Sequence, residues 1–170
     1  HLSWSSVASY FTNHYVLMYQ PLPILSFAIN YNLSGLNVVP LHLVNILFHC
    51  LNIILVYIFL RSLFKIEIIA LIAAALFAFH PMNSEAVIWI SARSSAMYTF
   101  FYLSALIIYI RFLDRKTIGY YIITLILFLL ALFSKSQSVT LPVVLLLIDY
   151  FKGQNFKSSR VWLEKIPFFM

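Results

Sequence analysis

The chain has 170 residues, of which 63% are hydrophobic and only 9% are charged. A soluble globular domain carries about 25% charged residues, so this composition excludes one and indicates an integral membrane protein. The net charge of +6 does not indicate nucleic-acid binding, because the basic residues lie in short clusters between apolar segments, as membrane topology requires. The chain begins at His1 without a signal-peptide pattern, and we expect it to be part of a longer protein.

Residues 1–38 contain no membrane span. Aromatic residues alternate there with Ser, Asn and His, a composition typical of segments at the level of the lipid headgroups. Pro21 and Pro23 interrupt this region, and Gly35 and Pro40 mark a turn before the first apolar segment. We expect an extracytoplasmic juxtamembrane segment.

Five apolar segments follow, near residues 41–63, 66–80, 86–112, 118–134 and 138–151. A span needs about 20 residues, so the first and third are long enough, while the second and fifth are short spans or re-entrant segments. The sequence therefore predicts an all-α, polytopic transmembrane bundle of about five spans over residues 39–152. A cytoplasmic basic segment, 153–170, leads toward a further span.

The basic residues predict the orientation. If all five segments cross the membrane, nine bases share one side: Arg61, Lys65, Arg111, Arg115, Lys116, Lys152, Lys157, Arg160 and Lys165. Arg93 and Lys135 lie on the other side. By the positive-inside rule, residues 1–38, the turn at 80–93 and the turn at 134–138 are extracytoplasmic and gather at one face.

The stretch 80–93 is the longest polar interruption in the apolar sequence. Asn83 is predicted to cap a helix over 84–93, which would place Glu85, Trp89 and Arg93 in one row on its surface. The alternative is a polar turn between helices, with a capping Glu and an Arg that reaches toward the headgroups.

Arg93 and Lys135 are each the one base in an outer loop, where bases are disfavoured. Each could hold an anion such as a lipid phosphate, assisted by the backbone N–H groups of the helix near Ser84. The alternative is that they pair with ordinary lipid headgroups or with Glu85.

Segment 41–63 carries a polar stripe of two histidines and two asparagines on one side of its predicted helix: His42, Asn45, His49 and Asn52. Such a stripe faces a bundle interior, where hydrogen bonds between helices are its ordinary role. His42, nearest the outer face, could instead touch a ligand. Metal binding is not expected, because no carboxylate or cysteine lies at ligand spacing.

Catalysis by a general base or nucleophile needs a carboxylate, or a serine with a base. Of the five acids, Glu85 alone is predicted to lie at the outer face. The residues by themselves therefore indicate an outer-face, anion-binding membrane bundle and no more.

Several motifs in order resemble a known family. They are Tyr19-Gln20-Pro21-Leu22, His42-Leu43-Val44-Asn45 with His49, His80-Pro81 followed by Glu85-Ala86-Val87, Trp89 and Arg93, then Ser134-Lys135, Val139-Thr140-Leu141-Pro142, Asp149-Tyr150 and Glu164-Lys165-Ile166-Pro167-Phe168-Phe169. The chain resembles the membrane part of the tetratricopeptide-repeat transmembrane O-mannosyltransferases and their bacterial relatives, which are polytopic glycosyltransferases of the GT-C type.

The resemblance implies a polyprenyl- or dolichyl-phosphate sugar donor, with mannose as a candidate sugar, and a protein or glycan acceptor outside the cytoplasm. It assigns the donor phosphate to Arg93 and Lys135, and adds to the outer-face site His42, His80, Glu85, Trp89 and Gln20. Gln20 stands where the family usually has Arg. The family's catalytic acids follow a first span that precedes residue 1, so we expect this piece to be inactive by itself, and no cofactor is implied.

Two other functions are weighed beside the enzyme. A non-catalytic anchor or scaffold for a tetratricopeptide-repeat domain would need no paired acids upstream. A transporter is disfavoured, because the ionisable groups gather at one face instead of lining a path at the midplane. The host membrane is a bacterial inner membrane or the endoplasmic reticulum.

Overall fold

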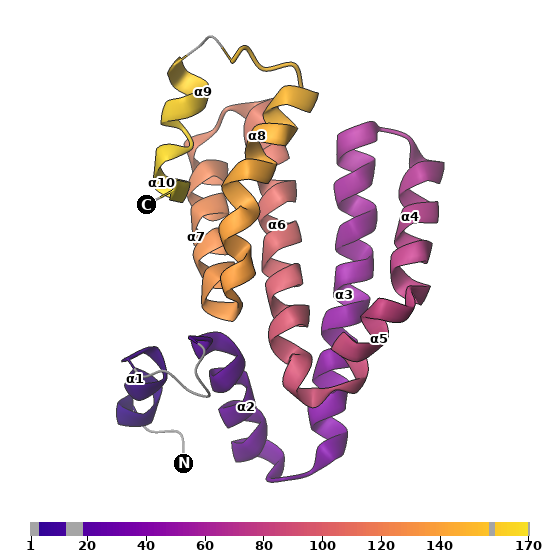
Figure 1. The fold of residues 1–170 in the computed structure, drawn as a ribbon, viewed down its shortest axis with the longest axis vertical. Coiled ribbons are helices and arrows are strands. Elements are labelled where there is room, and N and C mark those ends of the chain that lie inside the picture. Colours follow the sequence, from indigo (N-terminus) through magenta and orange to yellow (C-terminus); the bar gives the residue numbers. More distant parts are fainter. Residues whose placement is uncertain (1–3, 13–18, 157–158, 170) are drawn as a thin grey trace.

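The computed structural model describes residues 4–12, 19–156 and 159–169, and every regular element in these ranges is helical (Figure 1). The elements are α1 (Trp4–Thr12), α2 (Pro21–Ser34), α3 (Val38–Phe64), α4 (Glu67–Phe79), α5 (Pro81–Ile88), the 3₁₀ turn η1 (Ile90–Ala92), α6 (Arg93–Arg115), α7 (Ile118–Ser134), the 3₁₀ turn η2 (Ser136–Thr140), α8 (Leu141–Phe151), α9 (Ser159–Leu163) and α10 (Ile166–Phe169). The predicted all-α membrane bundle is confirmed.

Two helices in the described ranges are long and apolar enough to cross a membrane: α3, and α6 together with η1 (Ile90–Arg115). Helices α4 and α5 meet that test only as a pair, and they are bent by 57° at their junction. Helix α7 and the pair η2–α8 are shorter apolar segments. The count of five spans therefore stays a prediction, as do the domain boundaries at residues 38 and 152.

The long helices place the predicted outer loops at one end of the bundle. In Figure 1 the α3–α4 and α6–α7 turns lie at one end, whereas α2, α5 and the α7–α8 turn lie at the other. At the first end, Lys65 and Lys116 close their helices in the left-handed backbone conformation, with φ of 60° and 52°. Their N–H groups donate to Arg61 and Phe112, satisfying carbonyls that the helix end leaves free.

Labelling of single cysteines should report which end faces outward. The positive-inside count predicts that a cysteine at Ser91 reacts with a membrane-impermeant maleimide from the outer side and that one at Thr117 does not. Both positions are exposed, and the native Cys50 must first be replaced because it is exposed as well. Reaction of the Thr117 variant from the outer side would show that the predicted orientation is wrong.

Helix α6 lies at the centre of the packing, and half of its apolar window is buried. Its C-terminal half joins α7, α8 and α10 in the main apolar cluster, which comprises Ala105, Leu106, Tyr109, Ile110, Phe112, Leu113, Phe128, Leu141, Leu145, Ile148 and Phe168. Helix α3 is only 11% buried over its window, so most of it is left for lipid or for other parts of the protein. Small residues, Ala70 and Ala74, are buried on α4, as is usual where membrane helices approach closely.

Candidate functional site

Helix α5 begins at a proline, and its cap differs from the prediction. His80 has an extended backbone, which is the conformation that a following proline favours, and its Nδ1 accepts a hydrogen bond of 3.2 Å from the N–H of Met82. His80 is thus the N-cap, and the prediction of Asn83 in that role is wrong. Asn83 lies inside α5 and its Nδ2 donates to the carbonyl of Phe77 at 2.7 Å, which holds the bend between α4 and α5.

The predicted helix over 84–93 is interrupted at Trp89. In an unbroken helix the Trp89 carbonyl would accept from the N–H of Arg93. Here it accepts instead from the N–H of Ala92 and from Nδ2 of Asn45 on α3, at 3.0 Å each. The row of Glu85, Trp89 and Arg93 on one helix face is therefore wrong, because the tertiary bond to Asn45 ends α5 and lets α6 start in a new direction.

Arg93 is completely buried at the start of α6. Its Nε donates to Oδ1 of Asn45 at 3.1 Å, and its Nη2 donates to the carbonyl of Leu41 at 2.9 Å. Its Nη1 donates to Oγ of Ser26 at 3.2 Å and to Oδ1 of Asn30 at 2.7 Å. The guanidinium therefore joins α6 to α2 and α3.

The surroundings of Arg93 differ from those of an outer-face base. Its guanidinium carbon lies 4.1 Å from the centre of the Phe27 ring on α2, within the range of a cation–π contact. The four hydrogen bonds use four of the five N–H groups of an arginine. No ion pair joins Arg93 to Glu85 among the described residues, so the alternative in which these two pair is not supported.

Three of the four residues of the polar stripe on α3, Asn45, His49 and Asn52, contact other helices, as predicted. Asn45 is completely buried, and Asn52 is 2% exposed and donates to the carbonyl of Ala96 on α6 at 2.9 Å. His49 is half-buried, stacks on Phe77 of α4 and lies 3.4 Å from the Ala78 carbonyl. These contacts bind α3 to both of its neighbours.

Lys135 closes α7 at the predicted outer end, where it is half-buried. Its Nζ donates to Oγ of Ser95 on α6 at 2.7 Å, and it makes no ion pair within the described ranges. Ser95 also lines a cavity of about 240 Å³ between α3, α5 and α6, together with Glu85 and Trp89. Ser95 thus links Lys135 to the cavity that Glu85 and Trp89 line, although Lys135 itself is not one of the lining residues.

The other predicted site residues lie around this centre. His42 is half-buried and lines an open groove together with Phe27 and Trp89. Gln20 precedes α2, and its neighbour Tyr19 packs edge-on against Phe133, two residues before Lys135. His80 lies apart, beside an apolar hollow at the α4–α5 bend. Among the described residues, no three His, Cys, Asp or Glu side chains are grouped so that they could hold a metal ion.

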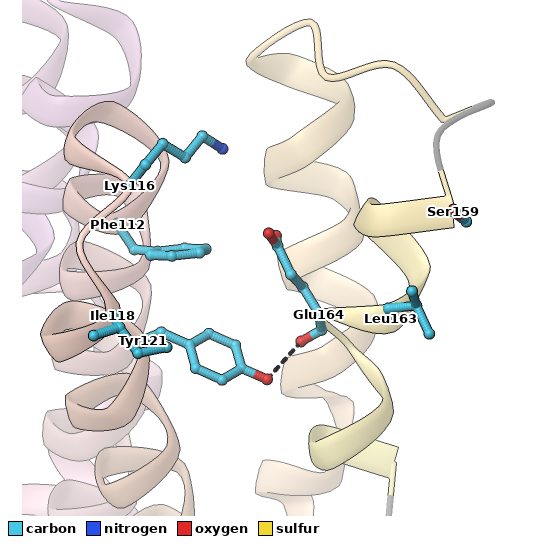
Figure 2. Close-up of a pocket in the computed structure, with 7 residues that line it drawn as sticks. All are labelled: Phe112, Lys116, Ile118, Tyr121, Ser159, Leu163 and Glu164. Carbon is cyan, nitrogen blue, oxygen red and sulfur yellow. Dashed lines mark hydrogen bonds between the residues drawn. The ribbon is translucent and has the colours of Figure 1, made fainter.

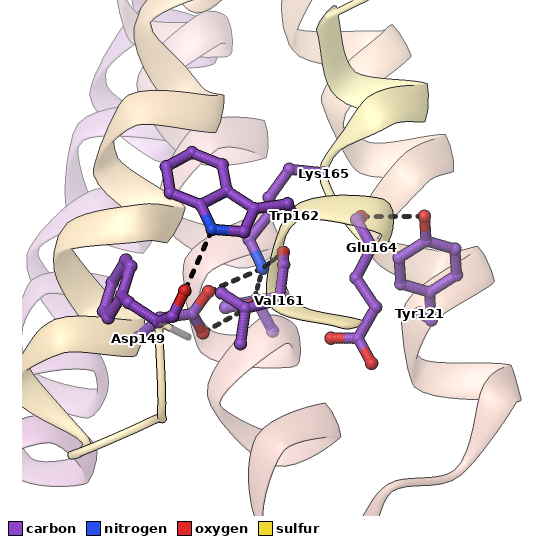
Figure 3. A network of polar contacts seen from close by, with 8 residues as sticks. Tyr121, Asp149, Val161, Trp162, Glu164 and Lys165 are labelled. Carbon is purple, nitrogen blue, oxygen red and sulfur yellow. Dashed lines mark hydrogen bonds and ion pairs between the residues drawn. The ribbon is translucent and has the colours of Figure 1, made fainter. Parts of the chain in front are cut away.

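A second polar network, toward the predicted inner end, was not found from the sequence. Nζ of Lys165 lies 2.6 Å from Oδ2 of Asp149 on α8, and both side chains are 1% exposed (Figure 3). Tyr109 of α6 donates to Oδ1 of Asp149 at 2.7 Å and accepts a hydrogen bond from Lys165. The available signal was one acid inside an otherwise apolar segment, because such a group needs a partner.

A cavity of about 430 Å³ lies beside this network, between the α6–α7 turn and α9. Figure 2 shows its lining residues, with the Phe112 and Tyr121 rings on one wall and Leu163 and Glu164 on the other. Tyr121 donates to the Glu164 backbone carbonyl at 3.0 Å, which joins the two walls at their base. None of the residues predicted for the outer site lines this cavity.

Comparison with known proteins gives the family. The model of the family described as dolichyl-phosphate-mannose-protein mannosyltransferase matches residues 20–169. Protein O-mannosyl-transferase TMTC1 of Homo sapiens is 33% identical over 148 residues, which is 81% of this chain and 17% of the relative. Protein O-mannosyl-transferase Tmtc1 of Drosophila melanogaster is 36% identical over 122 residues, which is 72% of this chain and 14% of the relative. Protein O-mannosyl-transferase TMTC3 of Homo sapiens is 31% identical over 141 residues, with 81% of this chain and 15% of the relative covered.

The chain thus corresponds to less than a fifth of the length of each of these three relatives. No solved structure matches it significantly. The match covers the segment from Gln20 through the Lys165 network, so it includes both the residues predicted for the outer site and the Asp149–Lys165 ion pair. The chain therefore belongs to the dolichyl-phosphate-mannose-protein mannosyltransferase family, as its resemblance to the transmembrane O-mannosyltransferases indicated.

Proposed function

We propose that this chain forms part of the outer-face site of a membrane glycosyltransferase. The whole enzyme would take a sugar, mannose, from a dolichyl- or polyprenyl-phosphate donor and transfer it to a protein or glycan hydroxyl outside the cytoplasm. The family description and the names of the relatives support this reaction. The protein would be a multi-pass protein of a bacterial inner membrane or of the endoplasmic reticulum, in contact with membrane lipids.

The observation that carries the proposal is the environment of Lys135. Its ammonium group is held by the Ser95 hydroxyl at the outer end, and no carboxylate among the described residues neutralises it. A half-buried cation without a counter-ion favours an anion that arrives from elsewhere, and a lipid phosphate is the anion available at a membrane surface. The adjacent cavity at Glu85 and Trp89 leaves room for a group attached to that phosphate.

For Arg93, contact with the donor phosphate stays a prediction. With four of its N–H groups already donated inside the bundle, Arg93 would reach a phosphate with the remaining one or by releasing α2. We therefore assign the direct phosphate contact to Lys135 and propose that Arg93 holds α2 and α3 in place beneath it.

Replacing Lys135 with methionine in the full-length protein tests this assignment. A hydrogen bond to a charged group contributes about 1.5–3 kcal/mol, so we expect transfer from the lipid-linked donor to fall about ten- to hundredfold. The measurement is the rate of sugar transfer in proteoliposomes at several donor concentrations. The effect should appear in the donor affinity and not in the amount of protein inserted into the membrane.

The matched control is Lys65→Met, the same substitution at an exposed residue at the opposite end of the bundle. It should leave transfer unchanged. If Lys135→Met retains the wild-type donor affinity, Lys135 does not bind the phosphate and the proposed site is wrong.

A non-catalytic scaffold is the second candidate, and one observation favours it. The outer end of the described bundle presents one carboxylate, Glu85, whereas general acid–base chemistry at a sugar generally employs positioned carboxylates. Paired acids just after the preceding span of the full gene would support the enzyme, and their absence would support the scaffold.

A further inference from the structure

The cavity between α3, α5 and α6 contains an unusual polar group. Asn52 lines the cavity, is 2% exposed, and donates through Nδ2 to the Ala96 carbonyl. Its Oδ1 is buried and accepts no hydrogen bond from any described residue. Buried polar groups are nearly always paired, so this acceptor indicates that a hydrogen-bond donor belongs at the site.

The rest of the lining defines what that donor can be. Glu85 adds a carboxylate and Thr99 a hydroxyl, while Trp89 and Phe77 add aromatic surface. Among the described residues no lysine or arginine lines the cavity, so a phosphate or carboxylate would be desolvated there without a cation. The lining instead suits a neutral ligand that offers several O–H donors together with an apolar face.

The size of the cavity selects a small ligand. Its volume of about 240 Å³ is several times the share of one water molecule in the liquid, which is about 30 Å³. It lies below the range of about 300–1,000 Å³ that is usual for sites of drug-sized ligands, so it can hold one ring and not a chain of rings.

We propose that this cavity binds a neutral polyhydroxyl ring, with Asn52 and Glu85 as acceptors for its hydroxyl groups. Ser95, the residue that holds Lys135, is among the lining residues. Under the proposed function, on which this placement rests, the ring is the sugar attached to the donor phosphate or a sugar of a glycan acceptor. Both sources have the same chemistry and would contact the same acceptors.

Saturation-transfer NMR with methyl α-mannoside and the full-length protein in nanodiscs tests the cavity without needing catalysis. We expect transfer to the ring protons in the wild type. Asn52→Leu removes one acceptor, and Glu85→Gln weakens the other on an exposed helix where folding is not at risk. Each should weaken binding about two- to tenfold, as expected for one lost hydrogen bond.

The control is Thr124→Val, which removes another buried polar group, one that bonds only within its own helix α7. It should bind the mannoside as the wild type does. Displacement by lipid-linked mannose would identify the donor sugar as the source, and displacement by an acceptor glycan would identify the acceptor.

The proposal fails if the wild type gives no saturation transfer, which would mean that the cavity holds only water. It also fails if Asn52→Leu and Glu85→Gln both bind as the wild type does. Its failure is distinguishable from that of the proposed function. If mannoside binding depends on Asn52 while Lys135→Met leaves sugar transfer unchanged, the cavity binds the ring but Lys135 does not bind the phosphate. If Lys135→Met lowers transfer while mannoside binding does not depend on Asn52 or Glu85, the phosphate site is supported and the cavity proposal is wrong.

Discussion

Replacing Lys165 with methionine is expected to destabilise the part of the bundle around α8 and α10 by about 3–5 kcal/mol, because it leaves a buried carboxylate without its cation. Asp149 and Lys165 are each 1% exposed and lie 2.6 Å apart, so little water would reach the remaining charge. Tyr109 would remain as the one described hydrogen-bond donor to the Asp149 carboxylate. The measurement is the free energy of unfolding of the full-length protein in mixed detergent micelles.

The matched control is Lys152→Met. Lys152 lies 3.7 Å from Asp114, whose side chain is 60% exposed, and surface pairs of this kind contribute about 0–1 kcal/mol. The double variant Lys165→Met, Asp149→Leu should recover most of the loss, because replacing both members of a buried pair with apolar residues is often neutral. Equal effects of Lys165→Met and Lys152→Met would show that the buried pair does not hold α10 to α6 and α8.

The sequence predicts well those helices whose limits are set by neighbouring residues in the chain. Helices α3, α4 and α7 begin and end within a few residues of the predicted apolar segments, because apolar runs bounded by charged or proline residues define their limits. The α3 stripe was predicted for the same reason, since Asn45, His49 and Asn52 share one side of a regular helix. The family was also identified from motifs in the sequence.

The break at Trp89 could not be predicted in this way, because its cause is distant in the sequence. Asn45 lies 44 residues before Trp89 and donates a hydrogen bond to its carbonyl. No pattern within residues 84–93 therefore predicts where α5 ends. The burial of Arg93 has the same origin: its partners come from α2 and α3. A count of charges in loops treats each base as exposed, and it therefore placed Arg93 at the surface.

Arg93→Ala should release α2 from the bundle. The substitution leaves Asn45 Oδ1 completely buried without its donor, frees the oxygens of Asn30 and Leu41, and removes the cation–π contact with Phe27. A buried acceptor left unpaired costs about 1–3 kcal/mol and a desolvated cation–π contact about 2 kcal/mol, so we expect a loss of about 3–5 kcal/mol. Hydrogen exchange of the backbone amides over 21–34 in the full-length protein is the measurement, and protection there should fall sharply.

Arg93→Lys separates the two roles considered for this residue. Lysine keeps the charge, but its single ammonium group cannot donate to α2 and α3 with the geometry of a planar guanidinium or stack on Phe27 in the same way. If Arg93 acts by holding α2, the lysine variant loses protection over 21–34 almost as the alanine variant does, whether or not donor is bound. If Arg93 acts mainly as a phosphate ligand, both variants keep that protection and lose only donor affinity. Because four of the five N–H groups already bond within the bundle, we expect the first result, with any loss of transfer following from the displacement of α2.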